Sequence, residues 1–358
     1  MLTLTAALAE RDYSVTAAMP LDHGNVEADD FRRHGVSFVP LSSPSPTAIH
    51  RILELGRLFE AESPMLIHAH GARAAFWAYW ALRWARLSAR TPLVVSVHGF
   101  AAPFYRQPRR FLQAAMMRRV CHRAAVTIAC AEAERTAMLA ARIAPRDKVR
   151  VVHYGIDLAA FTQLAMPDRV RARELLGVAP DARLALIVCR LARPRDFQSL
   201  LRAFRTVVTA SPTSSLFIVG GGPLQSEIEA LLADLDLSDR VKLWGFRRDV
   251  AQFYAAADAF VLTSWGWEGL PISVIEAQAA GIPAIVTDAG GSAEAIDPGS
   301  TGLLVPCRDP DALGAALHRV IGNEEEARAM GIRARQFAMA HFDTPRMLKK
   351  MRDIYAHL

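Results

Sequence analysis

Short apolar runs alternate with longer helical stretches along almost the whole chain, and this alternation restricts the fold more than any other feature. The runs are apolar at consecutive positions, which is typical of strands that are buried on both faces. Strands that alternate with helices favour a parallel sheet covered by helices. The sequence therefore predicts an α/β protein. Its strands are expected near 13–19, 36–41, 65–70, 93–98, 125–130, 149–153, 184–189, 215–220, 241–245, 259–263, 282–287 and 303–305.

Length and local composition predict two domains. A chain of 358 residues is long enough for two cores of ordinary size. Pro167 and Pro180 flank a short helical stretch, and such a stretch between prolines is typical of a linker. We therefore expect a first domain over residues 1–165, a second over 166–342 and a terminal helix over 343–358.

Composition excludes several protein classes. Hydrophobic residues make up 52% of the chain and the net charge is +6, as expected for a soluble globular protein. No stretch reaches the ~18 continuous apolar residues of a membrane span, and no signal peptide precedes the first helix. The pI near 9.4 would suit nucleic acid, but no nucleic-acid-binding motif is present. The four cysteines lack metal-ligand or disulfide-framework spacing, which indicates a cytoplasmic protein without a metal site.

Two glutamates, Glu268 and Glu276, surround a Gly-Leu-Pro turn between an apolar run and a helix. Pro271 suits the first turn of that helix, where its missing N–H costs nothing, and the unpaired amides there can bind a phosphate. Glu268 would lie at the mouth of the turn, and Glu276 more than one helical turn further along. This layout fits a nucleotide sugar, with the sugar beyond the diphosphate and the ribose behind it. An acidic loop beside a solvated helix face has the same spacing, so the neighbouring motifs decide.

Two arginines and a glycine turn lie upstream of the two glutamates, each after a predicted strand. Arg190 ends the run 184–189 and Arg195 lies in the loop beyond it, where two cations can neutralise a diphosphate leaving group. The run 215–220 leads into a turn around Gly221, and glycines let a backbone approach a ligand closely. Each signal is weak by itself, because surface arginines and glycine turns are common in α/β proteins.

In their order along the chain, these motifs resemble the retaining glycosyltransferases of family 4, over residues 148–358. Glu268 and Glu276 match the family's Glu-x7-Glu, while Arg190 and Arg195 match its Arg-Leu-x-x-x-Lys with arginine in place of lysine. The resemblance implies the GT-B fold, in which two Rossmann-like domains face each other across a cleft. It also implies that the C-terminal helix returns to the first domain.

The resemblance implies a chemistry as well: retaining, metal-independent transfer of a sugar from a nucleotide-diphosphate sugar. The donor would be a UDP sugar or a GDP sugar, and no cofactor would be needed. The implied donor-binding residues are Arg190, Arg195, Gly221, Gly269, Leu270 and Glu276. The two arginines would hold the diphosphate together with the helix amides, and Glu276 would accept hydrogen bonds from the ribose hydroxyls. Glu268 would act catalytically, contacting the donor sugar and stabilising positive charge at its anomeric carbon.

Three histidines close strands of the first half. His98 lies where the family has an active-site histidine, and the resemblance assigns it a catalytic role in orienting the sugar or the leaving group. His70 and Gly99 would line the cleft on the acceptor side. His68 shares a strand face with His70, and we expect it to be structural. Zinc binding by this pair is disfavoured because no further ligands have recognisable spacing. Tyr154 stands where the family usually has asparagine.

The start of the chain departs from the family pattern. Family members begin with an apolar strand and a glycine-rich loop, whereas residues 1–10 already match the helix that follows and 13–19 the next strand. We therefore expect the first domain to lack its first strand and glycine loop, which would leave ladder edges unpaired. A start codon assigned too far downstream and a truncated chain are the two explanations, and we favour the first.

A basic segment over residues 104–123 combines arginines with aromatic residues and methionines. Such a segment can dock on anionic lipid headgroups at the inner face of the cell membrane, which suits an enzyme that extends a lipid-linked acceptor. A solvated helix with one stripe facing the core also explains it and is the simpler interpretation.

The resemblance implies a glycan or lipid-linked acceptor and a role in making cell-envelope polysaccharide or glycolipid. Two alternatives stay open: a nucleotide-sugar 2-epimerase on the same architecture, and a catalytically degenerate partner subunit. A dehydrogenase is disfavoured because no Gly-x-Gly-x-x-Gly follows a first strand.

Overall fold

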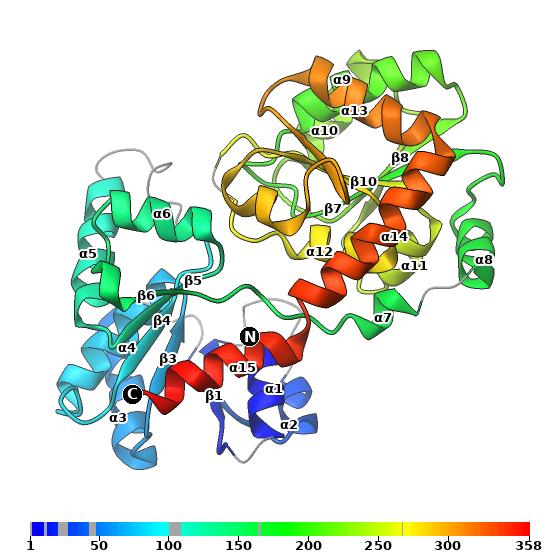
Figure 1. The fold of residues 1–358 in the computed structure, drawn as a ribbon. Coiled ribbons are helices and arrows are strands. Elements are labelled where there is room, and N and C mark those ends of the chain that lie inside the picture. The colour runs from blue at the N-terminus through cyan, green and yellow to red at the C-terminus, as the bar shows by residue number, and fades with distance from the viewer. Residues whose placement is uncertain are drawn as a thin grey trace. The chain divides into compact units, whose positions relative to one another are not determined.

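The computed structural model describes residues 2–10, 13–20, 28–42, 48–99, 109–163, 166–266 and 268–358. The chain forms two compact units: unit 1 comprises Met1–Ile156 with Thr344–Leu358, and unit 2 comprises Asp157–Asp343 (Figure 1). Every strand pair described in either unit is parallel, with helices around the sheets. The predicted α/β fold class is confirmed.

Unit 2 is built on a six-stranded parallel sheet in the order β12-β11-β10-β7-β8-β9. Its strands are β7 (Arg183–Val188), β8 (Ser214–Val219), β9 (Val241–Gly245), β10 (Ala259–Leu262), β11 (Ala284–Thr287) and β12 (Gly302–Val305). Its helices are α7 (Ala159–Thr162), α8 (Met166–Leu176), α9 (Phe197–Ala210), α10 (Gln225–Asp234), α11 (Ala251–Ala256), α12 (Ile272–Ala280), α13 (Pro310–Gly322) and α14 (Glu324–His341). Helices α9, α10 and α13 cover one face of the sheet, and α11, α12 and α14 cover the other (Figure 1). All six strands lie within two residues of their predicted positions, because each is an apolar run buried on both faces.

The centre of this sheet is the point where the strand order reverses. Strands β7 and β10 pair there, through Ala185 with Ala259 and Leu186 with Phe260, and the chain winds outward from them in both directions. In doubly wound sheets the loops after two such strands diverge at the carboxyl edge and leave a crevice for a ligand. The arginines predicted after β7 and the glutamate predicted after β10 therefore belong to the same edge.

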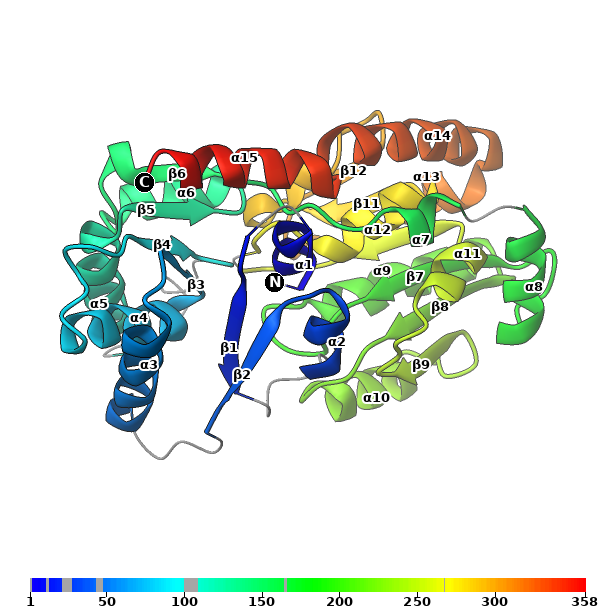
Figure 2. The same ribbon diagram turned by 90° about the horizontal axis from the view of Figure 1, so that it is seen from below.

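Unit 1 contains two separate parallel sheets in the described part of the chain. Strands β3 (Ile67–His70), β4 (Leu93–Ser96), β5 (Val126–Ala129) and β6 (Val149–Val151) form one in sequence order, and β1 (Thr16–Pro20) pairs with β2 (Ser37–Leu41) in the other (Figure 2). The helices are α1 (Leu2–Ala9), α2 (Ala28–Arg33), α3 (Ala48–Glu62), α4 (Ala72–Trp84), α5 (Arg109–Arg123), α6 (Glu132–Ala140) and α15 (Thr344–Ala356). No described strand joins the two sheets.

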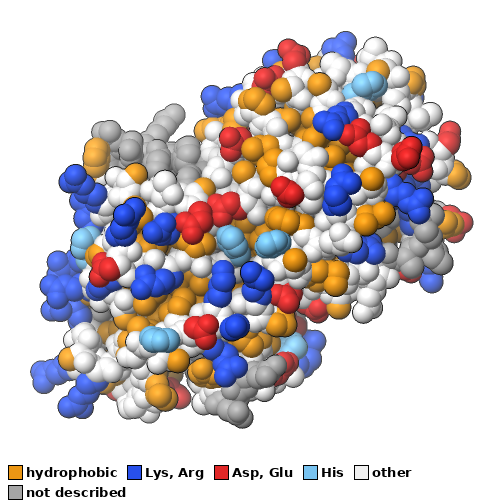
Figure 3. Space-filling model, in the orientation of Figure 1, with side chains coloured by type: hydrophobic (Ala, Val, Ile, Leu, Met, Phe, Trp, Pro, Cys, Tyr) orange, Lys and Arg blue, Asp and Glu red, His pale blue; other side chains and the backbone are white. Residues whose placement is uncertain are grey.

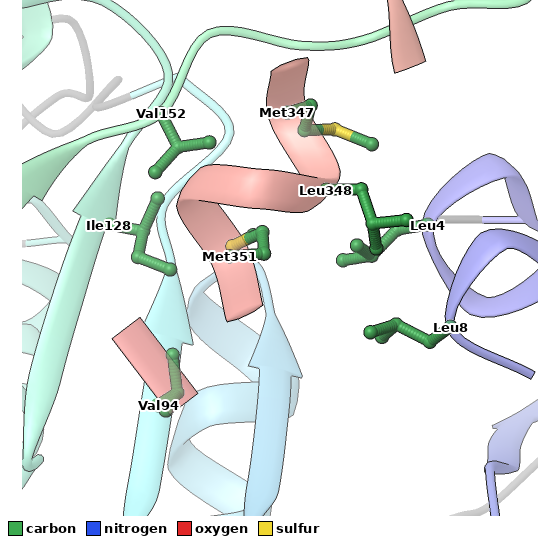
Figure 4. Close-up of a cluster of buried hydrophobic side chains, with 8 residues drawn as sticks. All are labelled: Leu4, Leu8, Val94, Ile128, Val152, Met347, Leu348 and Met351. Carbon is green, nitrogen blue, oxygen red and sulfur yellow. The ribbon is translucent and has the colours of Figure 1, made fainter. Parts of the chain in front are cut away.

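The C-terminal helix α15 is part of the core of unit 1. Figure 4 shows its apolar side chains between the four-stranded sheet and α1. This cluster consists of Leu4, Leu8, Val94, Ile128, Val152, Met347, Leu348 and Met351. The two units divide at residues 156 and 157, whereas the predicted boundary at 165 and 166 falls inside unit 2. The reason is that α7 contacts α11 and α12 and so belongs to unit 2.

Candidate active site

The loops after β7 and β10 are joined by backbone and side-chain hydrogen bonds. The amide of Asp196 donates to the carbonyl of Thr263 across 3.1 Å, and the Thr263 hydroxyl donates back to the Asp196 carbonyl across 2.9 Å. The amide of Trp265 donates to the carbonyl of Pro194 across 3.1 Å. The two loops are therefore held together by hydrogen bonds at the carboxyl edge of the sheet.

Arg195 and Glu268 form an ion pair between these two loops. Nη1 of Arg195 donates to Oε2 of Glu268 and to Oγ of Ser264, and that hydroxyl lies 3.1 Å from the same carboxylate oxygen. The two charged side chains are only 17% and 16% exposed. The arginine predicted to hold the diphosphate thus directly contacts the glutamate predicted to face the sugar.

A close backbone approach positions Glu268. The amide of Gly291 donates to the carbonyl of Glu268 across 3.0 Å. Gly290 has φ +57°, and a Cβ added there would lie 2.2 Å from the Glu268 carbonyl oxygen. Only glycine fits this position, because a side chain would collide with backbone that cannot move alone.

Glu276 lies on α12 and is held by a buried tyrosine. Its Oε2 accepts a hydrogen bond of 2.7 Å from the hydroxyl of Tyr254 on α11. Burial raises the pKa of the Glu276 carboxyl, and the bond from Tyr254 opposes part of that rise. Helix α12 begins at Ile272 and Pro271 is its N-cap in an extended conformation, so the expectation that the proline lies inside the first turn is wrong by one position. Sequence analysis missed Tyr254, because one tyrosine in an apolar helix resembles any other core residue.

Arg190 follows β7 directly and is exposed. Among the described residues its guanidinium has no hydrogen-bond or ion-pair partner. Leu270 is 3% exposed, so only its backbone could serve a ligand, and the neighbouring Gly269 is half-buried. The predicted set therefore combines one unpaired cation, one paired cation and the start of α12.

The glycine turn after β8 is shaped by backbone packing. A Cβ at Gly220 would lie 1.8 Å from the carbonyl oxygen of Cys189, and one at Gly222 would lie 2.4 Å from that of Leu191. Gly221 accepts a hydrogen bond of 3.0 Å from the Leu191 amide, and a Cβ there would meet only Phe246 at 3.9 Å. Backbone packing thus requires glycine at positions 220 and 222 but not at 221. The donor-binding role of Gly221 stays a prediction.

In unit 1, His98 lies in a chain of hydrogen bonds. Its Nε2 is 2.8 Å from Nδ1 of His70, and its Nδ1 is 2.8 Å from the hydroxyl of Tyr154. The rings of His70 and His98 are stacked with centroids 5.0 Å apart. Although His98 is exposed on one side, loss of hydration on the other lowers its pKa to about 4, and burial lowers the pKa of His70 well below its ordinary value. Both imidazoles are therefore neutral at pH 7.

His68 is bonded through both ring nitrogens. Its Nδ1 is 2.6 Å from the hydroxyl of Tyr355 on α15, and its Nε2 is 2.7 Å from Oγ of Ser96. Burial, followed by the nearby charge of His98, lowers its pKa to about 3. These contacts suit the structural role expected for His68, since they tie α15 to the sheet.

The loop that carries Gly99 is anchored by hydrogen bonds to a buried carboxylate. Glu134 on α6 is 0% exposed, and its two oxygens accept hydrogen bonds of 2.7 Å each from the amides of Gly99 and Cys130. These amides follow β4 and β5, so one side chain ties the ends of two strands together. Sequence analysis missed Glu134, which looks like an ordinary acidic residue in the first turn of a helix.

The basic segment is described only from residue 109, so residues 104–108 of the predicted membrane contact lie outside the described part. On α5, Phe111 is 61% exposed and Leu112 is 75% exposed. Arg118 instead donates to the carbonyls of Ala141 and Arg142, at 3.1 and 2.9 Å. Figure 3 shows basic side chains along the edge of unit 1 over α5. None of the described helices has both the length and the apolar character that crossing a bilayer requires.

A doubly wound parallel sheet with cations and carboxylates gathered at its switch point defines a nucleotide-binding α/β enzyme. Family models cover most of the chain: residues 1–160 match the model described as Glycosyltransferase Family 4, and residues 168–337 match Glycosyl transferases group 1. The chain belongs to glycosyltransferase family 4, and it is a glycosyltransferase.

Three curated relatives are named as glycosyltransferases. UDP-Gal:alpha-D-GlcNAc-diphosphoundecaprenol alpha-1,3-galactosyltransferase of Escherichia coli is 25% identical, over 85% of this chain and 78% of its own. GDP-mannose-dependent monoacylated alpha-(1-6)-phosphatidylinositol monomannoside mannosyltransferase of Corynebacterium glutamicum is 32% identical, over 56% of this chain and 54% of its own. D-inositol 3-phosphate glycosyltransferase of Nocardia farcinica is 33% identical, over 53% of this chain and 44% of its own. The chain therefore spans about half the length of the latter two.

Solved structures share the fold. Anabaena Alr3699/HepE, in complex with UDP and glucose, superposes with a TM-score of 0.86 at 21% identity, over 100% of this chain and 95% of its own. WaaG, a glycosyltransferase involved in lipopolysaccharide biosynthesis, superposes with a TM-score of 0.76 at 17% identity, over 99% and 94%. These similarities confirm the predicted GT-B class with its two Rossmann-like domains.

Proposed function

We propose that the protein transfers a sugar from a nucleotide-diphosphate sugar to a glycan or lipid-linked acceptor, with retention at the anomeric carbon and without a metal ion. The observation that supports this proposal is the ion pair of Arg195 and Glu268 at the carboxyl edge of β7 and β10, with Arg190 in the loop after β7 and Glu276 on α12.

Charge at this edge supports diphosphate binding. Arg190 supplies a cation that no described carboxylate neutralises, and Arg195 supplies a second, which is 17% exposed and paired with Glu268. Guanidinium groups bind phosphate oxygens through two parallel hydrogen bonds. The first amides of α12 add the partial positive charge of a helix N-terminus. Together these groups stabilise the charge that grows on the leaving diphosphate, which is the task a metal ion performs in other transferases.

Glu276 would bind the ribose. Tyr254 occupies its Oε2, and Oε1 has no hydrogen-bond partner among the described residues. A carboxylate oxygen in this setting can accept bonds from ribose hydroxyls. Because Tyr254 is itself fully buried, the carboxylate is held in place before the ligand arrives.

Glu268 and Arg195 would act in the transfer itself. When the bond from the anomeric carbon to the diphosphate oxygen breaks, its electron pair leaves with the diphosphate. Arg195 stabilises that charge, and the Glu268 carboxylate stabilises the positive charge left on the sugar. The acceptor hydroxyl attacks from the face that the diphosphate leaves, and its proton passes to a phosphate oxygen. The neutral His98 would orient the sugar or the leaving group by hydrogen bonding.

A lipid-linked acceptor is supported by relatives and by α5. The Escherichia coli relative is named for a diphosphoundecaprenol acceptor, and the Corynebacterium relative for a phosphatidylinositol mannoside. Exposed Phe111 and Leu112 lie on a helix rich in arginine, which suits docking on an anionic membrane surface. The four free cysteines suit the reducing cytoplasmic side of that membrane.

Thermal-shift measurements with UDP, GDP and ADP sugars test the donor site. One class should raise the melting temperature, because a ligand that binds only the folded state stabilises it. We expect Arg190→Ala to remove nearly all of this shift and Glu276→Ala to weaken it. Arg171→Ala, an exposed arginine on α8, should leave it unchanged. Wild-type shifts in both site variants would overturn the assigned roles.

Product analysis tests the reaction. With donor and acceptor supplied, the anomeric configuration seen by NMR should match that of the donor, and a chelator should leave the rate unchanged. Inverted product would contradict the mechanism. Interconversion of the nucleotide sugar without acceptor would favour the 2-epimerase alternative.

Vesicle sedimentation tests the membrane contact. Vesicles that contain the anionic lipid phosphatidylglycerol should retain the protein, and pure phosphatidylcholine should not. Phe111→Ser with Leu112→Ser should release it. Met65→Ser is the control, since Met65 is 92% exposed but lies outside α5. Equal retention of all three proteins would exclude α5 as the contact.

A further inference from the structure

A polar cavity of about 340 Å³ opens in unit 2. Its walls come from the loop after β7, the first turns of α9, α10 and α13, and the segments after β10 and β12. The charged and aromatic residues on which the argument rests are Arg193, Arg195, Arg202, Glu227, Trp265 and Arg308. We call this cavity the arginine pocket.

The arginine pocket is separate from the candidate donor site. Its helices α9, α10 and α13 cover the face of the sheet opposite α12, which carries Glu276 (Figure 1). Arg190, Gly221 and Leu270 do not line it. Arg195 is the one member of the predicted donor set that reaches both.

Charge in the arginine pocket is not balanced. Four guanidinium groups face the carboxylates of Asp196 and Glu227. Asp196 keeps its negative charge, but its oxygens accept hydrogen bonds of 3.0 and 2.7 Å from the amide and hydroxyl of Ser199, and no guanidinium group pairs with it. Glu227 lies 3.5 Å from Arg193. Arg195 pairs with the carboxylate of Glu268 outside the pocket.

Two cations remain. Arg202 on α9 forms no hydrogen bond or ion pair with any described residue. Arg308 lies over the ring of Trp265, 4.6 Å from its centroid, and pairs with no described carboxylate. Stacking on the indole holds the guanidinium plane and leaves its edge free for hydrogen bonds. The pocket thus presents two guanidinium groups without a carboxylate partner among the described residues, and one of them lies over an aromatic ring.

We propose that the arginine pocket is a second anion site, which takes the phosphate or diphosphate group of a small phosphorylated molecule. Planar guanidinium groups bind phosphate oxygens in pairs, and neutralising the two cations stabilises the complex. The positive ends of α9 and α13 add to the same field. The cavity suits a small molecule in size. The site shares Arg195 with the donor site, but the proposal requires no assumption about the transfer reaction.

Isothermal titration calorimetry with inorganic pyrophosphate tests this site. In wild-type protein we expect two binding events, one at each site. The Arg190→Ala variant, which weakens the donor site, should keep the other. Adding Arg202→Gln or Arg308→Gln to Arg190→Ala should weaken the remaining event at least tenfold, since one charge-assisted hydrogen bond contributes about 1.5–3 kcal/mol.

Arg205→Gln is the matched control. Arg205 lies on the same helix but does not line the pocket, and it is exposed. This change in the Arg190→Ala protein should leave pyrophosphate affinity as it was. Circular dichroism melting of each variant shows that it is folded, and Arg202→Lys should recover part of the affinity. The proposal is overturned if Arg190→Ala protein binds no pyrophosphate, or if the changes at Arg202 and Arg308 have no more effect than the change at Arg205.

Discussion

The hydroxyl of Tyr254 donates a hydrogen bond of 2.7 Å to Oε2 of Glu276. Tyr254 is 1% exposed, with its ring edge-on to Phe161 at 5.4 Å and stacked on Phe260 at 5.8 Å. The carboxylate proposed to bind ribose is therefore held by a residue of the hydrophobic core. Packing around Tyr254 therefore controls the position of the Glu276 carboxylate.

Tyr254→Phe should weaken nucleotide-diphosphate binding about five- to twentyfold, because it removes a hydrogen bond of ~1–2 kcal/mol that orients Glu276. The ring stays in place, so stability should change little. Calorimetric titration with the nucleotide that binds wild type measures the effect. Tyr79→Phe is the control, because Tyr79 is also buried but lies on α4 in unit 1. Equal affinities for the two variants would show that Tyr254 has no part in nucleotide-diphosphate binding.

Glu268→Gln should lower kcat about 100-fold, because an uncharged amide cannot stabilise positive charge on the sugar, an effect of ~3 kcal/mol. Donor affinity should persist or rise, since Arg195 loses its carboxylate partner and becomes available to the diphosphate. Initial rates at saturating donor measure the loss. Glu174→Gln on α8 is the surface control. A variant with unchanged kcat would show that the Glu268 charge has no part in the transfer.

Gly290→Ala should destabilise unit 2 by about 3 kcal/mol or more and abolish activity. Its Cβ would lie 2.2 Å from the carbonyl oxygen of Glu268, so the backbone of that loop must shift. Gly299→Ala is the matched control: it has φ +82° and no atom within 4 Å of the added carbon, so only the left-handed conformation costs about 1 kcal/mol. Urea denaturation followed by tryptophan fluorescence compares the two. Equal losses would show that contact with Glu268 is not what Gly290 provides.

Stability should fall as pH drops from about 6.5 to 4, and the histidines of unit 1 should cause part of the fall. The pKa of His68 is lowered to about 3 and that of His98 to about 4, chiefly by burial, with His70 also well below its ordinary value. In this window the unfolded chain, with histidine pKa near 6.5, binds protons that the folded chain does not, so falling pH favours unfolding. Melting temperatures between pH 7 and pH 4 measure the slope.

The same series separates the histidines from the carboxylates that also titrate at low pH. His70→Gln should flatten the part of the slope between pH 6.5 and 5, where ordinary carboxylates remain ionised. His318→Gln, an exposed histidine on α13, should leave the slope as it is. A His70→Gln slope identical to wild type would mean that the His70–His98 pair titrates normally.

Local patterns in the sequence determined the strand positions, the α/β class and the order of the motifs. Apolar runs buried on both faces are visible without any partner, which is why β7 to β12 lie within two residues of their predicted positions. The placement of Arg190 and Arg195 after β7, and of Glu276 on α12, followed from those runs and from the family resemblance. Chain neighbours define such features, so a linear reading suffices.

Contacts between distant residues were decided by the tertiary structure alone. Arg195 and Glu268 are separated by 73 positions, and they meet because β7 and β10 are adjacent in the sheet order. Tyr254 beneath Glu276, and Glu134 between the ends of β4 and β5, likewise depend on which helix packs on which strand. Strand order and helix packing arise from the burial of whole faces, and no periodicity within one segment records which partner covers it.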